Sequence, residues 1–410
     1  MTRVVVTGVG AITPLGIGVD AFWDGLTNGR SGIRTIEHFD PTGLDVTIAG
    51  EVPGFNAKDF MDFKAARRMD RFSQFGVAAS REAIQNAGLE ITDDNRDRIG
   101  IMMNTGGGGI PTIENEVNVK AKSGAKRVSP FLIPLFAPNM ASCQVAITFD
   151  IHGPTVTSVA ACAAGVQAFV DAVHMIQRGD ADVVITGGTE GGITPVAIAS
   201  LTNMGALSRR NDEPAKASRP FDAERSGFVF SEGAAVAILE SEEHAARRGA
   251  NVLCEVSGGA YTSDAFHITA PDPNGRGAIA AMKRAIERAE LEPKDIDYVA
   301  AHATATEIGD IAETKSIKKV FGDHAYELAI SANKSMVGHL LGAAGAISSL
   351  ACILAIRDDV VPPTINLETP DPNCDLNYTP NVKREMPVRT ALANGFGFGG
   401  QNAVAVFKDV

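Results

Sequence analysis

The chain has 410 residues, which suits two or three domains or one large domain of two parts. Hydrophobic residues make up 45% and charged residues 21%, the ordinary composition of a soluble globular protein, and the net charge of −12 argues against a nucleic-acid-binding protein. No stretch of about 18 uninterrupted apolar residues is present, so no transmembrane helix is expected, and residues 1–7 run into a strand without a signal-peptide pattern.

Short strands rich in valine and isoleucine alternate with helical patterns along the chain. Strands are predicted over residues 4–7, 99–103, 183–186, 234–239 and 296–300. This alternation is typical of βαβ units and predicts an α/β fold with mostly parallel, buried sheets. A short polar helix over 240–249, followed by a strand over 251–256, predicts a boundary between two halves, residues 1–249 and 250–410.

A distant internal repeat supports two related halves. Residues 83–90 match residues 285–292 at five of eight positions, at a separation of 202 residues. Both segments belong to amphipathic helical patterns, and both precede a short polar stretch and a strand. The shared order of the flanking elements indicates a duplicated α/β unit.

Cys162 lies in the sequence Val-Ala-Ala-Cys-Ala-Ala-Gly over 159–165, between a β-rich run over 155–159 and a helical pattern. The apolar face of that helix carries Val166, Phe169, Val170 and Val173. The cysteine is therefore expected on a tight strand-to-helix turn, where the positive end of the helix favours the nucleophilic thiolate. A buried, inert cysteine is the alternative.

Two histidines in the second half also follow predicted strands. His302 comes directly after the strand over 296–300, and His339 lies in the segment 333–345, which follows a strand and opens a helix. Strand ends of this kind are where open α/β folds bind substrates. A single histidine is more often structural, but two at equivalent strand ends, with a cysteine similarly placed, favour a catalytic site.

Three glycine-rich segments differ in what they indicate. Residues 394–402 contain four glycines, which free backbone N–H groups to form an oxyanion hole, with a flexible hairpin as the alternative. Residues 7–16 lack the GxGxxG spacing of a dinucleotide site, and residues 106–109 lack the Lys-Ser/Thr of a P-loop. The five cysteines show neither a CxxC pair nor a Cys/His ligand spacing, so no disulfide framework or metal site is predicted, which fits a reducing cytoplasm.

Together these motifs resemble the condensing enzymes of the thiolase superfamily, most closely the β-ketoacyl-[acyl-carrier-protein] synthase II type. The resemblance spans essentially the whole chain, and its markers are residues 7–10, 153–154, 161–162, 218–222, 232–233, 302, 334–335, 338–339 and 397–400. It implies a thiolase-like five-layered α-β-α-β-α fold built from two duplicated βαβαβαββ halves. It also implies a cytoplasmic homodimer with no membrane insertion, in which the catalytic cysteine comes from the first half and both histidines from the second.

By this resemblance, Cys162 attacks an acyl thioester carried by acyl carrier protein and holds the acyl chain as a new thioester. Malonyl-carrier protein then loses carbon dioxide, and neutral His302 and His339 stabilise the resulting enolate. The backbone N–H groups of Cys162 and Phe398 hold the tetrahedral oxyanion, and Phe398 also resembles a gate to the acyl pocket. No cofactor is implied, because the phosphopantetheine of the carrier protein carries the substrates.

Further residues acquire expected roles from the same resemblance. Lys334 is expected to tune the charge of the site with Glu313 as its partner, and Thr304 and Thr306 to contact pantetheine. Gly107 stands where a bulkier aliphatic residue is common, which predicts a roomier acyl pocket. An acidic carrier protein needs a basic docking patch on this acidic chain, and the candidates are Lys64, Arg67, Arg68, Lys126 and Arg127.

The sequence departs from the family pattern at four positions near these motifs. Ala300 and Ala303 replace Asn and Gly around His302, Asn333 replaces Thr, and Gly395 replaces Ser. A type II polyketide ketosynthase is the nearest alternative function because it uses the same residues. A cysteine hydrolase is the alternative from another class. A thiolase, a synthase III and a chain-length factor fit less well, since each needs a different residue at a catalytic position.

Overall fold

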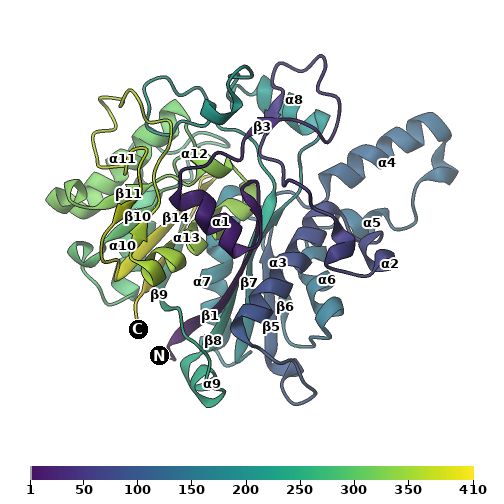
Figure 1. The fold of residues 1–410 in the computed structure, drawn as a ribbon, viewed down its shortest axis with the longest axis horizontal. Helices are drawn as coiled ribbons and strands as arrows, with labels where there is room; N and C mark the ends of the chain where they lie inside the picture. Colours follow the sequence, from purple (N-terminus) through teal and green to yellow (C-terminus); the bar gives the residue numbers. More distant parts are fainter. Residues whose placement is uncertain (1) are drawn as a thin grey trace.

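The structure, a computed structural model, describes residues 2–410 and is organised around one mixed sheet of eleven strands (Figure 1). The strand order is β11-β10-β14-β15-β9-β1-β8-β7-β5-β6, and β2 pairs with the outer end of β1. The sheet has two halves joined only where β1 meets β9, through the pairs Val5–Glu255 and Val6–Cys254.

The first half of the sheet combines parallel and antiparallel strands. Its strands are β1 (Val4–Thr13), β5 (Ile99–Asn104), β6 (Thr155–Val156), β7 (Val183–Glu190) and β8 (Gly233–Ser241). β5 runs parallel to β6 and β7, whereas β8 is antiparallel to both β7 and β1. Helix α3 (Arg71–Ala87) covers the outer face of β1 and β8.

The second half repeats this arrangement. Its strands are β9 (Cys254–Ser263), β10 (Tyr298–Ala300), β11 (Ala329–Ser331), β14 (Thr390–Gly397) and β15 (Gln401–Lys408). β10 is parallel to β11 and β14, and β15 is antiparallel to β14 and β9. Helix α10 (Arg276–Arg288) covers the outer face and packs against α11 (Glu307–Phe321).

Two buried helices fill the space between the halves of the sheet. α7 (Ala164–Gln177) and α13 (Ala344–Asp358) pack against each other, and each contacts strands of both halves. With α3 on one outer face and α10 on the other, this gives the five α-β-α-β-α layers that the family resemblance implied (Figure 1). The expectation of mostly parallel sheets was wrong. Only three residues separate β14 from β15, which is too few for a parallel crossover, so these two strands pair antiparallel.

The internal repeat corresponds to one packing arrangement used twice. A Cβ added at Gly8 of β1 would lie 2.4 Å from the carbonyl oxygen of Ala83, and one added at Gly258 of β9 would lie 2.4 Å from that of Ala285. Glycine thus lets each strand touch its covering helix in the same way. Each helix is followed by a residue with φ of 57°, Gly88 or Glu290. The duplicated unit that the sequence indicated is therefore present down to the ends of the helices.

The junction between the halves follows the predicted order. Helix α9 (Glu242–Arg247) precedes β9, which begins at Cys254 rather than at residue 251. The division into residues 1–249 and 250–410 stays a prediction. The segment Leu341–Asp358 has the length and mean hydropathy, 1.4, of a membrane span, but 83% of it is buried inside the protein, as expected for its place between the two halves of the sheet.

The remaining elements flank this core. The helices are α1 (Val19–Thr27), α2 (Phe63–Ala66), α4 (Ile110–Ser123), α5 (Leu132–Phe136), α6 (Met140–Phe149), α8 (Pro195–Asn203) and α12 (Lys334–Val337). The short strands are β2 (Gly16–Ile17), β3 (Arg34–Thr35), β4 (Ile48–Ala49), β12 (Val360–Val361) and β13 (Arg384–Glu385). α4 and α5 project from the side of the first half, beside α2 (Figure 1).

Candidate active site

Cys162 lies where the sequence placed it, on a sharp turn before a helix. It is the middle residue of the 3₁₀ turn η4 (Ala161–Ala163), which leads directly into α7. Ala161 has φ of 46°, a left-handed backbone conformation that residues other than glycine rarely adopt. The strand leading into the turn, β6, is shorter than the predicted run over 155–159. The turn buries the thiol, and Cys162 is only 4% exposed.

The structure brings both histidines to this cysteine. His339 Nε2 lies 3.0 Å from Cys162 Sγ, and the rings of His302 and His339 meet edge to face with centroids 5.5 Å apart. His302 follows β10, whereas His339 lies between α12 and the turn before α13. Residues from the two halves therefore form one cluster, because the ends of their strands and helices converge at the centre of the protein.

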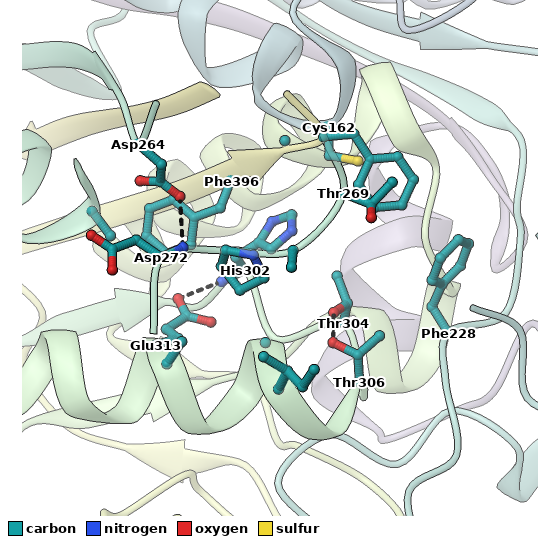
Figure 2. Close-up of a pocket in the computed structure, with 18 of the residues that line it drawn as sticks. Cys162, Phe228, Asp264, Thr269, Asp272, His302, Thr304, Thr306, Glu313 and Phe396 are labelled. Atoms are coloured by element: carbon teal, nitrogen blue, oxygen red, sulfur yellow. Dashed lines mark hydrogen bonds between the residues drawn. The ribbon is translucent and has the colours of Figure 1, made fainter. Parts of the chain in front are cut away.

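A cavity of about 380 Å³ opens onto the cluster. Cys162, both histidines and Phe398 line its inner end. Thr304 and Thr306 lie along its wall with their hydroxyl oxygens 3.0 Å apart (Figure 2). Met204 and Ile308 also line the cavity and are largely exposed, which places them toward its mouth. The arrangement suits a slender chain that reaches from the surface to the thiol.

Burial keeps both imidazoles neutral. The pKa of His302 and that of His339 lie well below the ordinary value, first because each ring is buried and second because the Lys334 cation is near. A neutral imidazole has one N–H and can donate it to a developing oxyanion. Lys334 itself is 3% exposed, and burial lowers its pKa to about 8, although the charges of Glu313 and Cys162 oppose that shift.

The thiol does not have the lowered pKa that the helix end led us to expect. Burial raises the pKa of Cys162 to about 11. The Lys334 cation and the N–H groups of Phe398 and Cys162 itself act in the opposite direction, but they do not outweigh the loss of water. The free protein therefore holds Cys162 as a thiol at neutral pH.

Glu313 supports the backbone beside His302. Its carboxylate accepts hydrogen bonds from the N–H groups of His302 (2.8 Å) and Ala303 (2.7 Å), and from Asn394 Nδ2 (2.9 Å). Within residues 2–410 it forms no ion pair with Lys334, so the expected pairing reduces to a longer-range attraction. Ala303 has φ of 36°, so the Ala that replaces the family's Gly occupies a strained backbone conformation.

Phe398 lies in the three-residue connection between β14 and β15. Gly399 and Gly400 follow it with φ of 83° and 73°, conformations that glycine adopts at no steric cost. The backbone N–H of Phe398 faces the sulfur of Cys162, and Phe398 lines the cavity. Phe398 therefore lies where both of its expected roles, as an oxyanion-hole donor and as a gate to the acyl pocket, would place it.

Gly107 does not line the cavity. A Cβ at this position would lie 2.9 Å from Cδ1 of Ile110, and the same methyl group would lie 3.4 Å from a Cβ at Gly192. Ile110 therefore fills the space that the missing side chain leaves. The roomier acyl pocket expected from Gly107 stays a prediction, and Ile110, at the start of α4, is the side chain that bounds this space.

The five expected docking residues are all exposed, and within residues 2–410 none of them forms an ion pair. Lys64, Arg67 and Arg68 lie on and just after α2, whereas Lys126 and Arg127 lie in the turn after α4. The guanidinium of Arg68 lies 5.5 Å from the ring centroid of Phe131, which ties α2 to the segment before α5. The charges therefore occupy two neighbouring segments of one side of the protein.

Three residues of the site escaped the sequence analysis. The ring of Phe228 meets His339 at 5.0 Å, and that of Phe396 meets His302 at 5.5 Å, so both restrict the imidazoles. Glu190 is fully buried near Cys162 and accepts N–H bonds from Gly106 and Gly342. A carboxylate at the end of an apolar strand could have pointed to Glu190. The strand was predicted to end at residue 186, so Glu190 was left outside it.

Comparisons with known proteins agree on one family. The family model "Beta-ketoacyl synthase, N-terminal domain" matches residues 1–245, and "Beta-ketoacyl synthase, C-terminal domain" matches residues 253–368. A 3-oxoacyl-[acyl-carrier-protein] synthase 2 of Synechocystis is 48% identical over 99% of this chain and 98% of its own. Proteins of the same name are 45% identical in Coxiella burnetii, over 100% of this chain and 99% of theirs, and 46% identical in Staphylococcus aureus, over 99% and 98%.

Solved structures share the whole fold. A β-ketoacyl synthase from Burkholderia phymatum superposes with a TM-score of 0.93 at 34% identity and covers 100% of both chains. A type II polyketide ketosynthase, solved in complex with its acyl-carrier protein, superposes with a TM-score of 0.92 at 33% identity and covers 100% of this chain and 99% of its own. These similarities extend over the cysteine turn and both histidine segments.

Proposed function

Because the chain belongs to the β-ketoacyl synthase family, as the resemblance predicted, we propose that it condenses an acyl thioester with malonyl-acyl carrier protein and lengthens a fatty acyl chain by two carbons. It is an acyltransferase. One observation carries the proposal for this site: the thiol of Cys162, 3.0 Å from His339, shares the inner end of one cavity with His302.

The first step moves the acyl chain from the carrier to the enzyme. The sulfur of Cys162 attacks the thioester carbon, the bond to the pantetheine sulfur breaks, and the proton of the thiol ends on the departing pantetheine sulfur. The tetrahedral oxyanion accepts hydrogen bonds from the backbone N–H groups of Cys162 and Phe398, which both face the sulfur of Cys162. Because the resting group is a thiol, it loses its proton as it attacks.

The second step forms the new carbon–carbon bond. Malonyl-carrier protein loses carbon dioxide, and the electron pair of the broken bond becomes an enolate whose oxygen accepts N–H bonds from His302 and His339. The enolate carbon attacks the thioester carbon on Cys162, the bond between that carbon and the cysteine sulfur breaks, and the thiolate that leaves takes up a proton from the solvent. Loss of one preorganised donor typically costs about 100- to 1000-fold in rate.

Lys334 and Glu313 support these steps without contacting the reacting atoms. The cation of Lys334 adds to the larger effect of burial in lowering the pKa of both histidines, and it lowers the thiol pKa against the effect of burial. Glu313 holds the backbone of His302 through two N–H bonds. We assign the nucleophile to the half over residues 1–249 and both imidazoles to the half over 250–410.

The carrier protein reaches the cavity from the surface. Thr304 and Thr306, on the cavity wall, suit the amide and hydroxyl groups of pantetheine. The exposed, unpaired cations Lys64, Arg67, Arg68, Lys126 and Arg127 suit an acidic carrier. The double variant Lys64→Glu/Arg68→Glu is expected to weaken carrier binding about tenfold at low salt and to remove most of its salt dependence, measured by titration calorimetry. Unchanged affinity would contradict this patch.

A homodimer is also part of the proposal. β6 is an edge strand of the large sheet, and its two residues are exposed. Val156 of β6 is itself an exposed apolar side chain, and Ile147 and Val159, which lie near β6 in the chain, are two more. An unpaired edge bordered by apolar side chains is the kind of surface that a second copy covers. We place the reaction in the cytoplasm and assign it no cofactor, since the cysteine and the histidines supply the chemistry.

The nearest alternative, a type II polyketide ketosynthase, has less support, because the type II polyketide ketosynthase of known structure is 33% identical to this chain, whereas the proteins named 3-oxoacyl-[acyl-carrier-protein] synthase 2 are 45% to 48% identical. A condensation assay tests the proposal. The protein is incubated with acyl- and malonyl-carrier proteins, and a carrier-bound 3-oxoacyl chain two carbons longer is expected, with none from Cys162→Ala. Release of free fatty acid without malonyl-carrier protein would instead identify a hydrolase.

A further inference from the structure

Two turns in the protein have the same conformation but different sequences. The turn that carries Cys162, Ala161–Ala163, begins at φ of 46° and leads into α7. The turn Leu341–Ala343 begins at φ of 42° and leads into α13. The duplication of the fold makes these turns counterparts, and their middle residues are Cys162 and Gly342. Gly342 thus occupies, in the second half, the place of the nucleophile.

The N–H groups of the two turns have different partners. The N–H of Cys162 faces its own sulfur and the cavity. The N–H of Gly342 instead donates to Glu190 Oε2 at 3.0 Å, and the N–H of Gly106 donates to the same oxygen at 2.9 Å. Glu190 ends β7 and is fully buried. A carboxylate of the protein therefore fills the site that serves an oxyanion in the other half.

The bond to Gly342 lies next to both catalytic segments. Gly342 comes three residues after His339, and its carbonyl oxygen lies only 3.0 Å from where a Cβ of Gly165 would be. Gly165 comes three residues after Cys162. We propose that Glu190 is a positioning residue, which anchors the turn before α13 to the first half of the protein and so sets the approach of His339 to Cys162.

The charge of Glu190 gives this role a measurable signature. Its carboxylate raises the pKa of the Cys162 thiol, in addition to the larger effect of burial. Burial in turn raises the pKa of Glu190 to about 7, so its carboxylate is ionised at the higher pH at which the thiol, with a pKa of about 11, titrates. Removing the charge while keeping the acceptor oxygen must therefore lower the thiol pKa.

Glu190→Gln removes the charge of Glu190 and keeps its hydrogen-bond acceptor. The amide oxygen keeps the position of Oε2 and accepts both N–H bonds, while the NH₂ group faces Thr105 Oγ1, which lies 3.5 Å from Oε1 in the wild type. Glu190→Ala removes the charge and both acceptors. Glu240→Gln is the matched control, because Glu240 is also fully buried at a strand end but pairs with Arg248, away from the site.

Alkylation of Cys162 by iodoacetamide is followed by intact mass from pH 7 to 10.5. Glu190→Gln is expected to shift the profile to lower pH and to speed alkylation at pH 8 by about two- to tenfold, while Glu240→Gln follows the wild type. This arm does not depend on the proposed function. A Glu190→Gln profile that superposes on the wild type would overturn the electrostatic part of the inference.

The positioning role rests on the proposed function and is read from condensation. Glu190→Ala is expected to lower kcat about 10- to 100-fold with little change in KM for acyl-carrier protein, and Glu190→Gln to restore most of kcat. A folded Glu190→Ala protein, with a wild-type far-ultraviolet spectrum and full kcat, would refute the role. If the wild type itself did not condense, the proposed function would fail while the alkylation result stood.

Discussion

The contact between α7 and α13 sets the distance between the nucleophile and His339, and Gly165 makes that contact possible. A Cβ at Gly165 would lie 2.3 Å from the backbone nitrogen of Ala346 and 3.0 Å from the carbonyl oxygen of Gly342. Ordinary contacts of this kind are about 3.4 Å or longer. Gly165→Ala must therefore push the start of α13 away by about 1 Å, because only backbone atoms face the new methyl group.

The expected cost of Gly165→Ala follows from that displacement. Overpacking a core typically costs about 1–3 kcal/mol, against a gain of up to about 1 kcal/mol from replacing a helical glycine, so a net loss of stability is expected. A shift of about 1 Å in the separation of Cys162 and His339, 3.0 Å in the wild type, is expected to lower kcat about 100-fold.

Gly76→Ala is the matched control in helix α3. Its added Cβ would meet no atom closer than 3.7 Å, so this variant is expected to keep full activity and to gain slightly in stability. Thermal unfolding and the condensation rate are measured for both variants. Wild-type stability and rate in Gly165→Ala would refute the view that the close contact of two backbones sets the geometry of the site.

Two further predictions concern the acyl pocket and the pH dependence. The family resemblance places the end of the acyl chain beside Gly107, outside the cavity that Thr304 and Thr306 line. Ile110→Ala is therefore expected to shift the product profile toward longer chains, and Gly107→Ile toward shorter ones, because both side chains compete for one space; identical profiles by mass spectrometry would contradict this reading. His302 and His339 have pKa values well below the usual range, so both stay neutral between pH 7.5 and 6. The rate of malonyl decarboxylation is therefore expected to change less than about twofold over this range. A fall in the rate with a midpoint near pH 6.5 would show that one of the two histidines has an ordinary pKa.

Local patterns and the internal repeat predicted much of the fold. The repeat between α3 and α10 could be recognised in the sequence because each helix needs alanines where it contacts a glycine of the strand that it covers. The direction of β8 and β15 could not be read, since parallel and antiparallel buried strands have the same composition. The position of Cys162 at a helix start was also visible.

The properties that depend on burial could not be predicted in the same way. The helix end pointed to a lowered thiol pKa, but the surrounding protein removes water from Cys162, and this effect is larger. The space beside Gly107 is filled by Ile110, whose direction depends on how α4 begins. Glu190 was missed because its partners, Gly106 and Gly342, are distant in the sequence and come from different halves.

Intact mass spectrometry of the protein with a long-chain acyl-carrier protein tests the central claim most directly. The account predicts a mass increase of one acyl group, located on Cys162 by peptide mapping, which disappears when malonyl-carrier protein is added as the carrier-bound 3-oxoacyl product forms. An acyl group on another residue, or an adduct that water removes as fast as malonyl-carrier protein does, would contradict it.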